Sequence, residues 1–176
     1  MFLENEIIKL RAPEPEDLDA LYKWENDTEL WSLGSTLVPY SRYDLKQYIL
    51  SPKDIYESKQ LRLIVEKKTE TKAVGMIDLY DFDLHNRRAA VGIIIDRAYQ
   101  RKGLASEALT LLCKYAFSFL NIHQLYAYIP VKNEPSMRLF GSCGFKNNGL
   151  LRDWVQTFDG YEDVLLVSLI SDFSDN

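Results

Sequence analysis

An apolar run, a glycine-containing turn and a long amphipathic segment follow one another in this chain and constrain its fold more than any other feature. Residues 91–95 read Val-Gly-Ile-Ile-Ile, and the turn 100–103, Gln-Arg-Lys-Gly, leads into the segment that starts at Leu104. We expect a buried strand and then a helix, whose first backbone N–H groups have no carbonyl partners and lie at the positive end of the helix dipole. Such a helix start attracts anions, so the sequence predicts a phosphate site there.

The residues of this turn distinguish it from the two commonest phosphate loops. No Gly-x-x-x-x-Gly-Lys-Ser/Thr occurs, which excludes a P-loop, and no Gly-x-Gly-x-x-Gly follows a strand, which argues against a Rossmann site. The pattern is instead Gln-x-x-Gly-x-Ala over residues 100–105. Gly103 lets the backbone approach a bulky diphosphate, and Arg101 and Lys102 add positive charge at its rim. The alternative interpretation is that Arg101 and Lys102 are solvated loop charges with no ligand.

Length and composition favour a single domain over residues 1–176. A chain of 176 residues suits one domain with a sizeable core. No apolar run approaches the roughly 18 residues that a membrane span needs, and residues 1–6 are acidic where a signal peptide is basic. We therefore expect a cytoplasmic protein with no membrane partner.

Charge and cysteine content narrow the partners further. The 26 acidic residues exceed the 21 basic ones, which favours polyamines or basic protein tails and disfavours nucleic acid. Cys113 and Cys143 lack CxxC spacing and are expected to be small buried residues. His85 and His123 have no partners at metal or triad spacing, so no metal site is expected.

Strand and helix signals alternate along the chain without repeats or a linker. The apolar stripe that starts at Leu104 continues to Leu120, so this helix must pack on a sheet. The pattern predicts a mixed fold of the α/β class, with the three layers of an α+β arrangement. Its central sheet is expected to be mixed, mostly antiparallel, of about seven strands, and flanked by helices. Strands are expected at 7–11, 61–66, 73–79, 91–95, 125–131, 145–154 and 164–170, and helices at 18–24, 43–50, 104–120 and 135–141.

The Gln-x-x-Gly-x-Ala motif and its context resemble the GNAT acyltransferase superfamily, whose acetyl-coenzyme A signature is Gln/Arg-x-x-Gly-x-Gly/Ala. Further landmarks of that superfamily follow in their usual order over most of the chain. The chain resembles two branches of this superfamily. Arg-Arg-Ala, Ile-Ile-Ile and Asn-Ile-His are similar to motifs of bacterial spermidine N-acetyltransferases. Asn-x-x-Ser and residues 15–18 and 24–27 are similar to motifs of ribosomal-protein N-terminal acetyltransferases. The landmarks are Asn-Arg-Arg-Ala at 86–89, Asn-Ile-His-Gln-Leu-Tyr at 121–126, Asn-Glu-Pro-Ser at 133–136 and Cys-Gly-Phe at 143–145.

The resemblance implies a fold in which two central strands, ending at Ile95 and near Pro130, splay apart. The pantetheine arm of acetyl-coenzyme A would lie in the gap, paired with backbone groups of one strand. The resemblance also implies a homo-oligomer, a dimer or larger. The residues expected to hold the cosubstrate are Ile93, Ile94, Ile95, Gln100, Arg101, Lys102, Gly103, Leu104, Ala105, Ser106 and Asn133.

Two positions that carry proton-transfer groups in the resembled families are apolar here. A Tyr hydroxyl four residues after the position of Ser136 is replaced by Phe140, and a carboxylate after the Arg-Arg-Ala start is replaced by Ala90. Three interpretations follow. Ser136 protonates the leaving thiolate, or the rate depends on proximity and oxyanion stabilisation, or catalysis is lost and the domain only binds acetyl-coenzyme A. A plain helix-capping role for Ser136 is the competing hypothesis.

Acidic residues on the expected acceptor side are candidates for binding an ammonium group. These are Glu25 and Asp27, and Asp78 near the end of a strand, whose alternative role is a solvated strand end. The predicted activity is direct acetyl transfer from acetyl-coenzyme A to a primary amine, most of all a polyamine such as spermidine. The alternatives are N-terminal acetylation of a ribosomal or other protein, with a peptide N-terminus as acceptor, and a regulatory acetyl-coenzyme A-binding domain. The expected core or rim aromatics are Trp24, Trp31 and Trp154.

Overall fold

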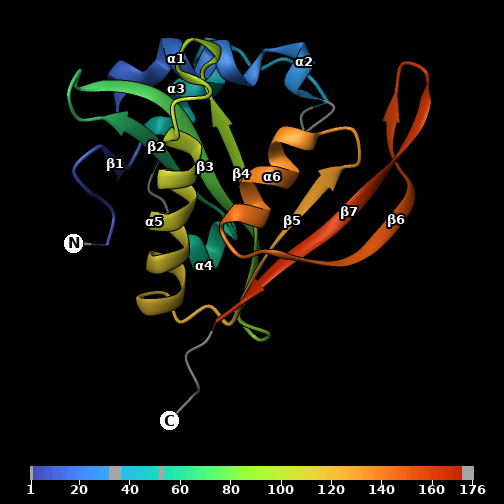
Figure 1. The fold of residues 1–176 in the computed structure, drawn as a ribbon. Helices are drawn as coiled ribbons and strands as arrows, with labels where there is room; N and C mark the ends of the chain where they lie inside the picture. Colours follow the sequence, from blue (N-terminus) through green and yellow to red (C-terminus); the bar gives the residue numbers. More distant parts are fainter. Residues whose placement is uncertain (1, 32–36, 52–53, 172–176) are drawn as a thin grey trace.

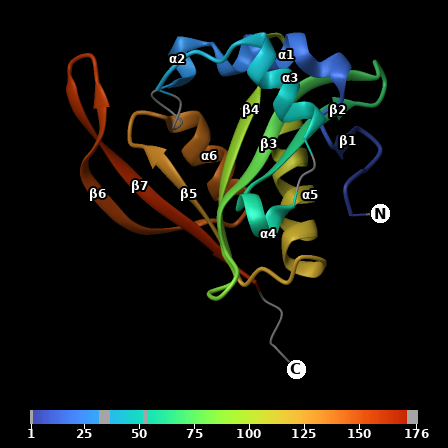
Figure 2. The ribbon, with the colours of Figure 1, turned by 180° about the vertical axis from the view of Figure 1, so that it is seen from behind.

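The computed structural model describes residues 2–31, 37–51 and 54–171 and shows a three-layer arrangement. Helices α5 and α6 cover one face of a twisted sheet, and α1 and α3 lie on the other (Figures 1 and 2). The helices are α1 (Leu18–Glu25), α2 (Thr28–Trp31), α3 (Arg42–Leu50), α4 (Ile55–Ser58), α5 (Leu104–Ser118) and α6 (Glu134–Ser142), with 3₁₀ turns at Pro15–Asp17 and Arg97–Tyr99.

Seven strands form one sheet in the order β1-β2-β3-β4-β5-β7-β6. Every neighbouring pair is antiparallel except β4 and β5, which are parallel and joined through α5. The predicted mixed, mostly antiparallel sheet flanked by helices is confirmed. The strands are β1 (Ile8–Arg11), β2 (Leu61–Lys67), β3 (Lys72–Asp83), β4 (Arg88–Ile95), β5 (Gln124–Pro130), β6 (Lys146–Thr157) and β7 (Gly160–Ile170).

The parallel pair β4 and β5 separates after a short contact. Its register covers only three residue pairs, from Arg88 with Gln124 to Ala90 with Tyr126. Beyond that point β4 pairs with β3 alone and β5 pairs with β7 alone. The splayed central strands expected from the family resemblance are therefore present (Figure 1).

Strand alternation divides the core between the two faces of the sheet. The larger cluster lies between the sheet and α5, where Leu109, Leu112 and Leu125 are fully buried. A smaller cluster on the opposite face holds α1 and α3 against β2 and β3. It consists of Leu21, Trp24, Leu45, Ile64 and Met76.

Some elements differ from the sequence-based expectation. Helices α2 and α4 were not predicted, because each has four residues, none of them buried, and so leaves no periodic apolar pattern. Cys113 is buried as expected, whereas Cys143 is only partly buried. Trp154 is 57% exposed, so it belongs to neither the core nor its rim.

Candidate functional site

The open edge of β4 is the first part of the candidate site. Backbone groups of successive strand residues point to opposite sides within the sheet. The Ile94 carbonyl is directed at Gly75 of β3, so the backbone groups of Ile93 and Ile95 face the gap. Gln100 donates from Nε2 to the Ile95 carbonyl at 3.1 Å. Of the three predicted strand residues, Ile93 and Ile95 therefore offer an edge to an amide-bearing arm, while the Ile94 side chain packs beneath α1.

The start of α5 is the second part of the site. Gly103 is the N-cap residue with φ +78°, and no side chain caps the first turn. A Cβ at Gly103 would meet nothing within 4 Å, so the approach to the helix N–H groups is open. Arg101 also has positive φ and is exposed, and Lys102 Nζ lies 2.9 Å from the Ala98 carbonyl. An uncapped helix start flanked by two cations fits a diphosphate group.

The next three residues contribute their backbone amides to this helix start. The Leu104 side chain is buried in the core, and Ala105 is half-buried. The Ser106 hydroxyl lies 3.8 Å from Sγ of Cys143, the C-cap residue of α6, and so faces the end of the neighbouring helix. The backbone N–H groups of these three residues therefore lie in the first turn of α5, which no side chain caps.

The start of α6 brings Asn133 and Ser136 together. Asn133 is the N-cap residue, and its Oδ1 accepts a hydrogen bond from the Ser136 backbone N–H at 3.2 Å. The capping hypothesis for the Ser136 hydroxyl is therefore wrong. That hydroxyl has no hydrogen-bond partner among the described residues. Beside Asn133 lies a pocket of about 270 Å³, lined also by Pro130, Lys132, Pro135 and Glu162.

The two apolar replacements are both buried. Phe140 is 4% exposed and packs edge-on against Phe145, with ring centroids 4.9 Å apart. Its position therefore serves the core. Ala90 is fully buried on β4, between its cross-strand partners Tyr80 and Tyr126. Burial raises the pKa of the Tyr80 phenol above its ordinary value.

Two of the three predicted acceptor carboxylates meet at one buried guanidinium. Arg62 of β2 contacts Glu25 and binds Asp78 with Nη2 at 2.6 Å from Oδ2. The Arg62 side chain is 12% exposed, and its guanidinium lies 5.6 Å from the ring centroid of Tyr48. Burial is the largest influence on the pKa of Arg62 and lowers it, but Asp78 and Glu25 outweigh burial and raise the pKa overall. Two carboxylates on one cation leave this cluster with a net negative charge.

Asp27 lies apart from that cluster. It pairs with Arg97 at 2.9 Å, and the same Nη2 atom lies 2.6 Å from Glu29. Arg97 belongs to the 3₁₀ turn between β4 and the Gln-x-x-Gly motif. The structure therefore joins Asp27 to the segment that follows β4, and not to the cluster around Arg62.

Asp96, at the end of β4, was missed from the sequence. Its Oδ2 accepts hydrogen bonds from Lys23 Nζ at 2.7 Å and Trp24 Nε1 at 3.0 Å, and its Oδ1 accepts from the Ala98 N–H. Burial is the largest influence on the pKa of Asp96 and raises it, but these hydrogen bonds together lower the pKa to about 2. Asp96 thus ties α1 to the turn before the anion site. The only local signal was an Asp that follows a strand and precedes a turn.

We expect Asp96→Asn to destabilise the fold at pH 7 and less so in acid. The folded pKa of about 2 lies below the value of about 3.9 for an unfolded Asp. A lowered pKa stabilises the folded state above the unfolded pKa, and this stabilisation is lost as the pH falls toward 2. Urea unfolding at pH 7 and pH 3 measures the difference. An equal loss at both pH values would show that the Asp96 charge has no part in it.

A row of aromatic side chains was also missed. Tyr126 and Tyr128 of β5 pack edge-on with centroids 5.6 Å apart, and Trp154 of β6 stacks on Tyr128 at 6.5 Å. Alternation on β5 places both tyrosines on the face opposite α5, and Figure 2 shows that no described helix covers β5, β7 and β6 there. The spacing Tyr-x-Tyr was the available signal, but it indicates a shared face without saying what covers that face.

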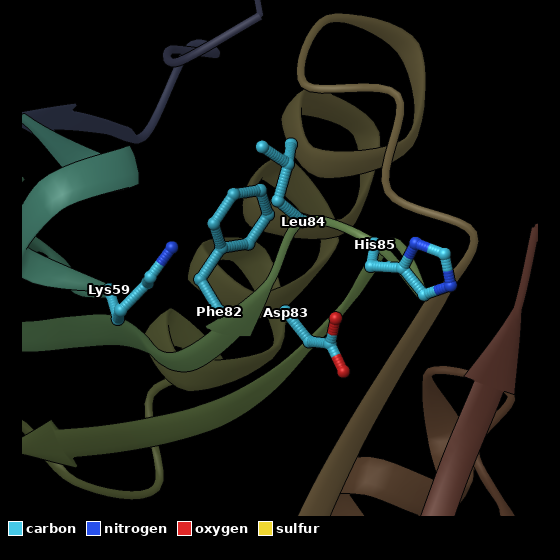
Figure 3. A pocket seen from close by; sticks show the side chains of 5 residues that line it. All are labelled: Lys59, Phe82, Asp83, Leu84 and His85. Carbon is cyan, nitrogen blue, oxygen red and sulfur yellow. The ribbon is translucent and has the colours of Figure 1, made fainter.

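A larger pocket than the one beside Asn133 lies elsewhere in the described residues. It has a volume of about 650 Å³ and lies at the turn between β3 and β4, at the opposite end of β4 from the anion site. Figure 3 shows Phe82 and Leu84 between Lys59 on one side and Asp83 and His85 on the other. Asp83 already accepts hydrogen bonds from Asn86, so we do not include this pocket in the site.

No group of three or more His, Cys, Asp or Glu side chains is arranged to hold a metal ion in ranges 2–31, 37–51 and 54–171. Within the same ranges, no helix has the length and apolar character needed to cross a membrane.

Comparisons with known proteins agree with this geometry. A family model described as an acetyltransferase (GNAT) domain matches residues 8–146. The spermidine N(1)-acetyltransferase of Escherichia coli K12 is 31% identical over 82% of this chain and 75% of its own. The crystal structure of the Vibrio cholerae spermidine N-acetyltransferase with CoA and spermine has a TM-score of 0.83 at 28% identity, covering 94% of this chain and 96% of its own. That enzyme also has a dodecameric structure, with a TM-score of 0.78 at 25% identity and coverage of 94% and 95%.

A ribosomal-protein-S5-alanine acetyltransferase from Vibrio fischeri is similar in fold. Its TM-score is 0.82 at 23% identity, and the match covers 96% of both chains. At this identity the likeness concerns the architecture alone, so it does not favour a peptide acceptor over a small amine.

Proposed function

Because this chain belongs to the GNAT acetyltransferase family, whose members are acyltransferases that use acetyl-coenzyme A, we propose that its acceptor is the primary amine of a polyamine such as spermidine. The observation that carries the choice of acceptor is the buried cluster of Glu25, Arg62 and Asp78, which has a net negative charge. A polyamine carries several positive charges and is attracted to such an excess of negative charge. The two spermidine acetyltransferases described above support the same assignment.

The residues present fit acetyl-coenzyme A. The backbone N–H groups after Gly103 would hold the diphosphate, with Arg101 and Lys102 at its rim. Backbone groups of Ile93 and Ile95 would pair with the amides of the pantetheine arm. When bound, the cosubstrate supplies an activated acetyl thioester to the gap between β4 and β5.

The chain's own residues then have to orient the amine and handle protons. An alkylamine with a pKa near ~10 is mostly protonated at neutral pH, so it must lose a proton before attack. The negative cluster of Glu25, Arg62 and Asp78 is suited to hold the charged amine near the gap. Ser136 is suited to protonate the leaving thiolate, since its hydroxyl is not engaged with any other described residue. No step of this direct transfer needs a covalent acyl-enzyme.

Release of free coenzyme A under steady-state conditions tests the proposed function. The purified protein is assayed with acetyl-coenzyme A and a panel of spermidine, spermine, short N-terminal peptides and aminoglycosides. We expect turnover with the polyamines and none with the peptides. Peptide turnover without polyamine turnover would overturn the proposed acceptor, and binding of acetyl-coenzyme A without turnover on any amine would overturn the proposed activity.

We expect Ser136→Ala to lower kcat for spermidine by about 100-fold if Ser136 is the proton donor, because positioned acids contribute about 10²–10⁴-fold. The KM for acetyl-coenzyme A should remain unchanged. Ser142→Ala is the matched control, because Ser142 lies on the same helix and donates its hydroxyl hydrogen to the Leu139 carbonyl. An unchanged kcat in Ser136→Ala would remove Ser136 from catalysis and leave proximity and oxyanion stabilisation as the source of the rate.

Two specific observations favour the alternatives. Asn133-x-x-Ser136 has the pattern of the N-terminal acetyltransferase branch, and its cap geometry is formed here. Buried Phe140 and Ala90 remove the usual proton-transfer groups, which favours a domain that binds acetyl-coenzyme A without turning it over. Both alternatives are outcomes of the substrate panel. We propose in addition that the chain acts in the cytoplasm as one domain within a homo-oligomer, as the dodecameric relative suggests.

A further inference from the structure

We propose that the aromatic row formed by Tyr126, Tyr128 and Trp154 binds the part of a linear polyammonium substrate that does not react. This proposal rests on the proposed function, and it deepens that function by assigning a second binding region to the acceptor. The row is distinct from the acidic cluster at Arg62 and from the anion site at Gly103.

The row starts where the two central strands separate. Tyr126 is the cross-strand partner of Ala90, the last paired residue of β4 before the gap. Tyr128 and Trp154 continue the row along β5 and onto β6, with neighbouring ring centroids 5.6 and 6.5 Å apart. A molecule lying on these rings therefore has one end at the gap, where the thioester is expected. The ring spacing is comparable to the three- or four-carbon segments between the nitrogens of a polyamine.

The rings are accessible, and those of Tyr128 and Trp154 lie against each other. Trp154 is 57% exposed and Tyr128 is 36% exposed, and the rings of the two stack with an interplanar angle of 23°. An exposed aromatic stack on a sheet face offers flat apolar surface for methylene groups and a negative ring face for cations. Both features suit a chain of ammonium groups separated by short hydrocarbon segments.

The charges around the start of the row complement a polycation. Tyr126 lies within electrostatic range of Asp81 and Asp83, and these carboxylates contribute to the raised pKa of its phenol after burial and Tyr128. Arg88 opposes them, and it pairs with Asp83 at 3.2 Å. On the other side of Ala90, the pKa of Tyr80 is raised by burial and further by Asp81. The surroundings of the row therefore have excess negative charge.

The same charge argues against a second copy of this chain as the occupant. A two-fold contact through the row would place this acid-rich region against itself or close to itself, because such an interface is self-complementary. Like charges close together oppose association. A small flexible polycation can contact the rings and the carboxylates at the same time.

The test compares substrates that differ in their second ammonium group. We expect Trp154→Leu to raise the KM for spermidine about 5- to 30-fold, the range expected for a lost cation–π contact. The KM for acetyl-coenzyme A should stay unchanged, and the KM for a linear monoamine of similar length should change much less. Trp154→Phe, which keeps a ring, should recover most of the affinity. Phe158→Leu is the matched control, because Phe158 is a fully exposed aromatic in the β6–β7 turn outside the row.

Calorimetric titration of spermidine into the protein saturated with coenzyme A gives a readout that does not need turnover. Weaker spermidine binding in Trp154→Leu supports the role of the aromatic row. This holds even if the wild-type protein acetylates no polyamine, a result that would overturn only the proposed function. Unchanged spermidine binding and KM in Trp154→Leu would overturn the row and leave the proposed function standing. An equal effect of Trp154→Leu on the KM for the monoamine would also overturn the proposed role of the row. A changed oligomeric state of this variant in size-exclusion chromatography would overturn it as well, because the row would then be a subunit contact.

Discussion

Replacing Arg62 by methionine should lower the free energy of unfolding by about 3–5 kcal/mol, the usual cost of removing one partner from a buried ion pair. The Arg62 side chain is 12% exposed, and those of Glu25 and Asp78 are 9% and 15% exposed. Methionine fills much of the same volume but leaves two carboxylates close together with no cation between them. Their repulsion and incomplete hydration destabilise the contact between α1 and strands β2 and β3.

Urea unfolding followed by circular dichroism measures this effect. Arg138→Met is the matched control, because Arg138 pairs with Glu134 on the surface of α6 with both side chains about 70% exposed. Such exposed pairs contribute about 0.3–0.5 kcal/mol. Adding Glu25→Gln and Asp78→Asn to Arg62→Met should restore part of the loss, because both uncompensated charges are then removed. A triple variant no more stable than Arg62→Met would show that lost packing, and not charge, causes the effect.

Gly75→Ala should destabilise the fold by about 2–3 kcal/mol, in the range found for overpacked cores. A Cβ at Gly75 would overlap the Ile94 carbonyl oxygen and lie 2.8 Å from Ile95 Cδ1. Since the first of these contacts is with backbone, β4 itself has to move. The opposite edge of β4 faces the gap, so we also expect the KM for acetyl-coenzyme A to rise.

Thermal unfolding and steady-state kinetics measure the two effects of Gly75→Ala. Gly141→Ala is the control, because a Cβ there meets nothing within 4 Å and Gly141 lies within α6. An alanine in a helix is favoured over glycine, so this control should be neutral or stabilising by up to about 1 kcal/mol. A Gly75→Ala variant as stable as Gly141→Ala would mean that β4 can shift at no cost.

The sequence predicted those features that depend on local pattern. The apolar run at 91–95 and the stripe that starts at Leu104 have the periods of a strand and a helix, and both elements were confirmed. The turn at Gly103 was predicted as well, because this glycine lies between the end of a strand pattern and the start of a helix pattern. In the structure Gly103 has a positive φ. These signals lie within a few residues of one another.

Features made by distant residues were not predictable in the same way. Glu25 and Asp78 were candidates, but nothing near Arg62 in the sequence indicated that it would join them, since its partners lie 37 and 16 positions away. Asp96 was missed for the same reason, because Lys23 and Trp24 come from the first helix. Trp154 is exposed because no described helix covers its strand (Figure 2). The pattern of a strand does not indicate whether a helix will cover it.

The short contact between β4 and β5 divides the sheet into two parts, β1 to β4 and β5 to β6, joined by three residue pairs and by α5. Each part presents an unpaired strand edge inside the protein, and open edges are prone to pair with the wrong chain. A ligand that fills the gap takes the place of a missing strand. Ligand binding then adds directly to the stability of the fold. We therefore expect a preparation stored with coenzyme A to remain dispersed longer than one without it.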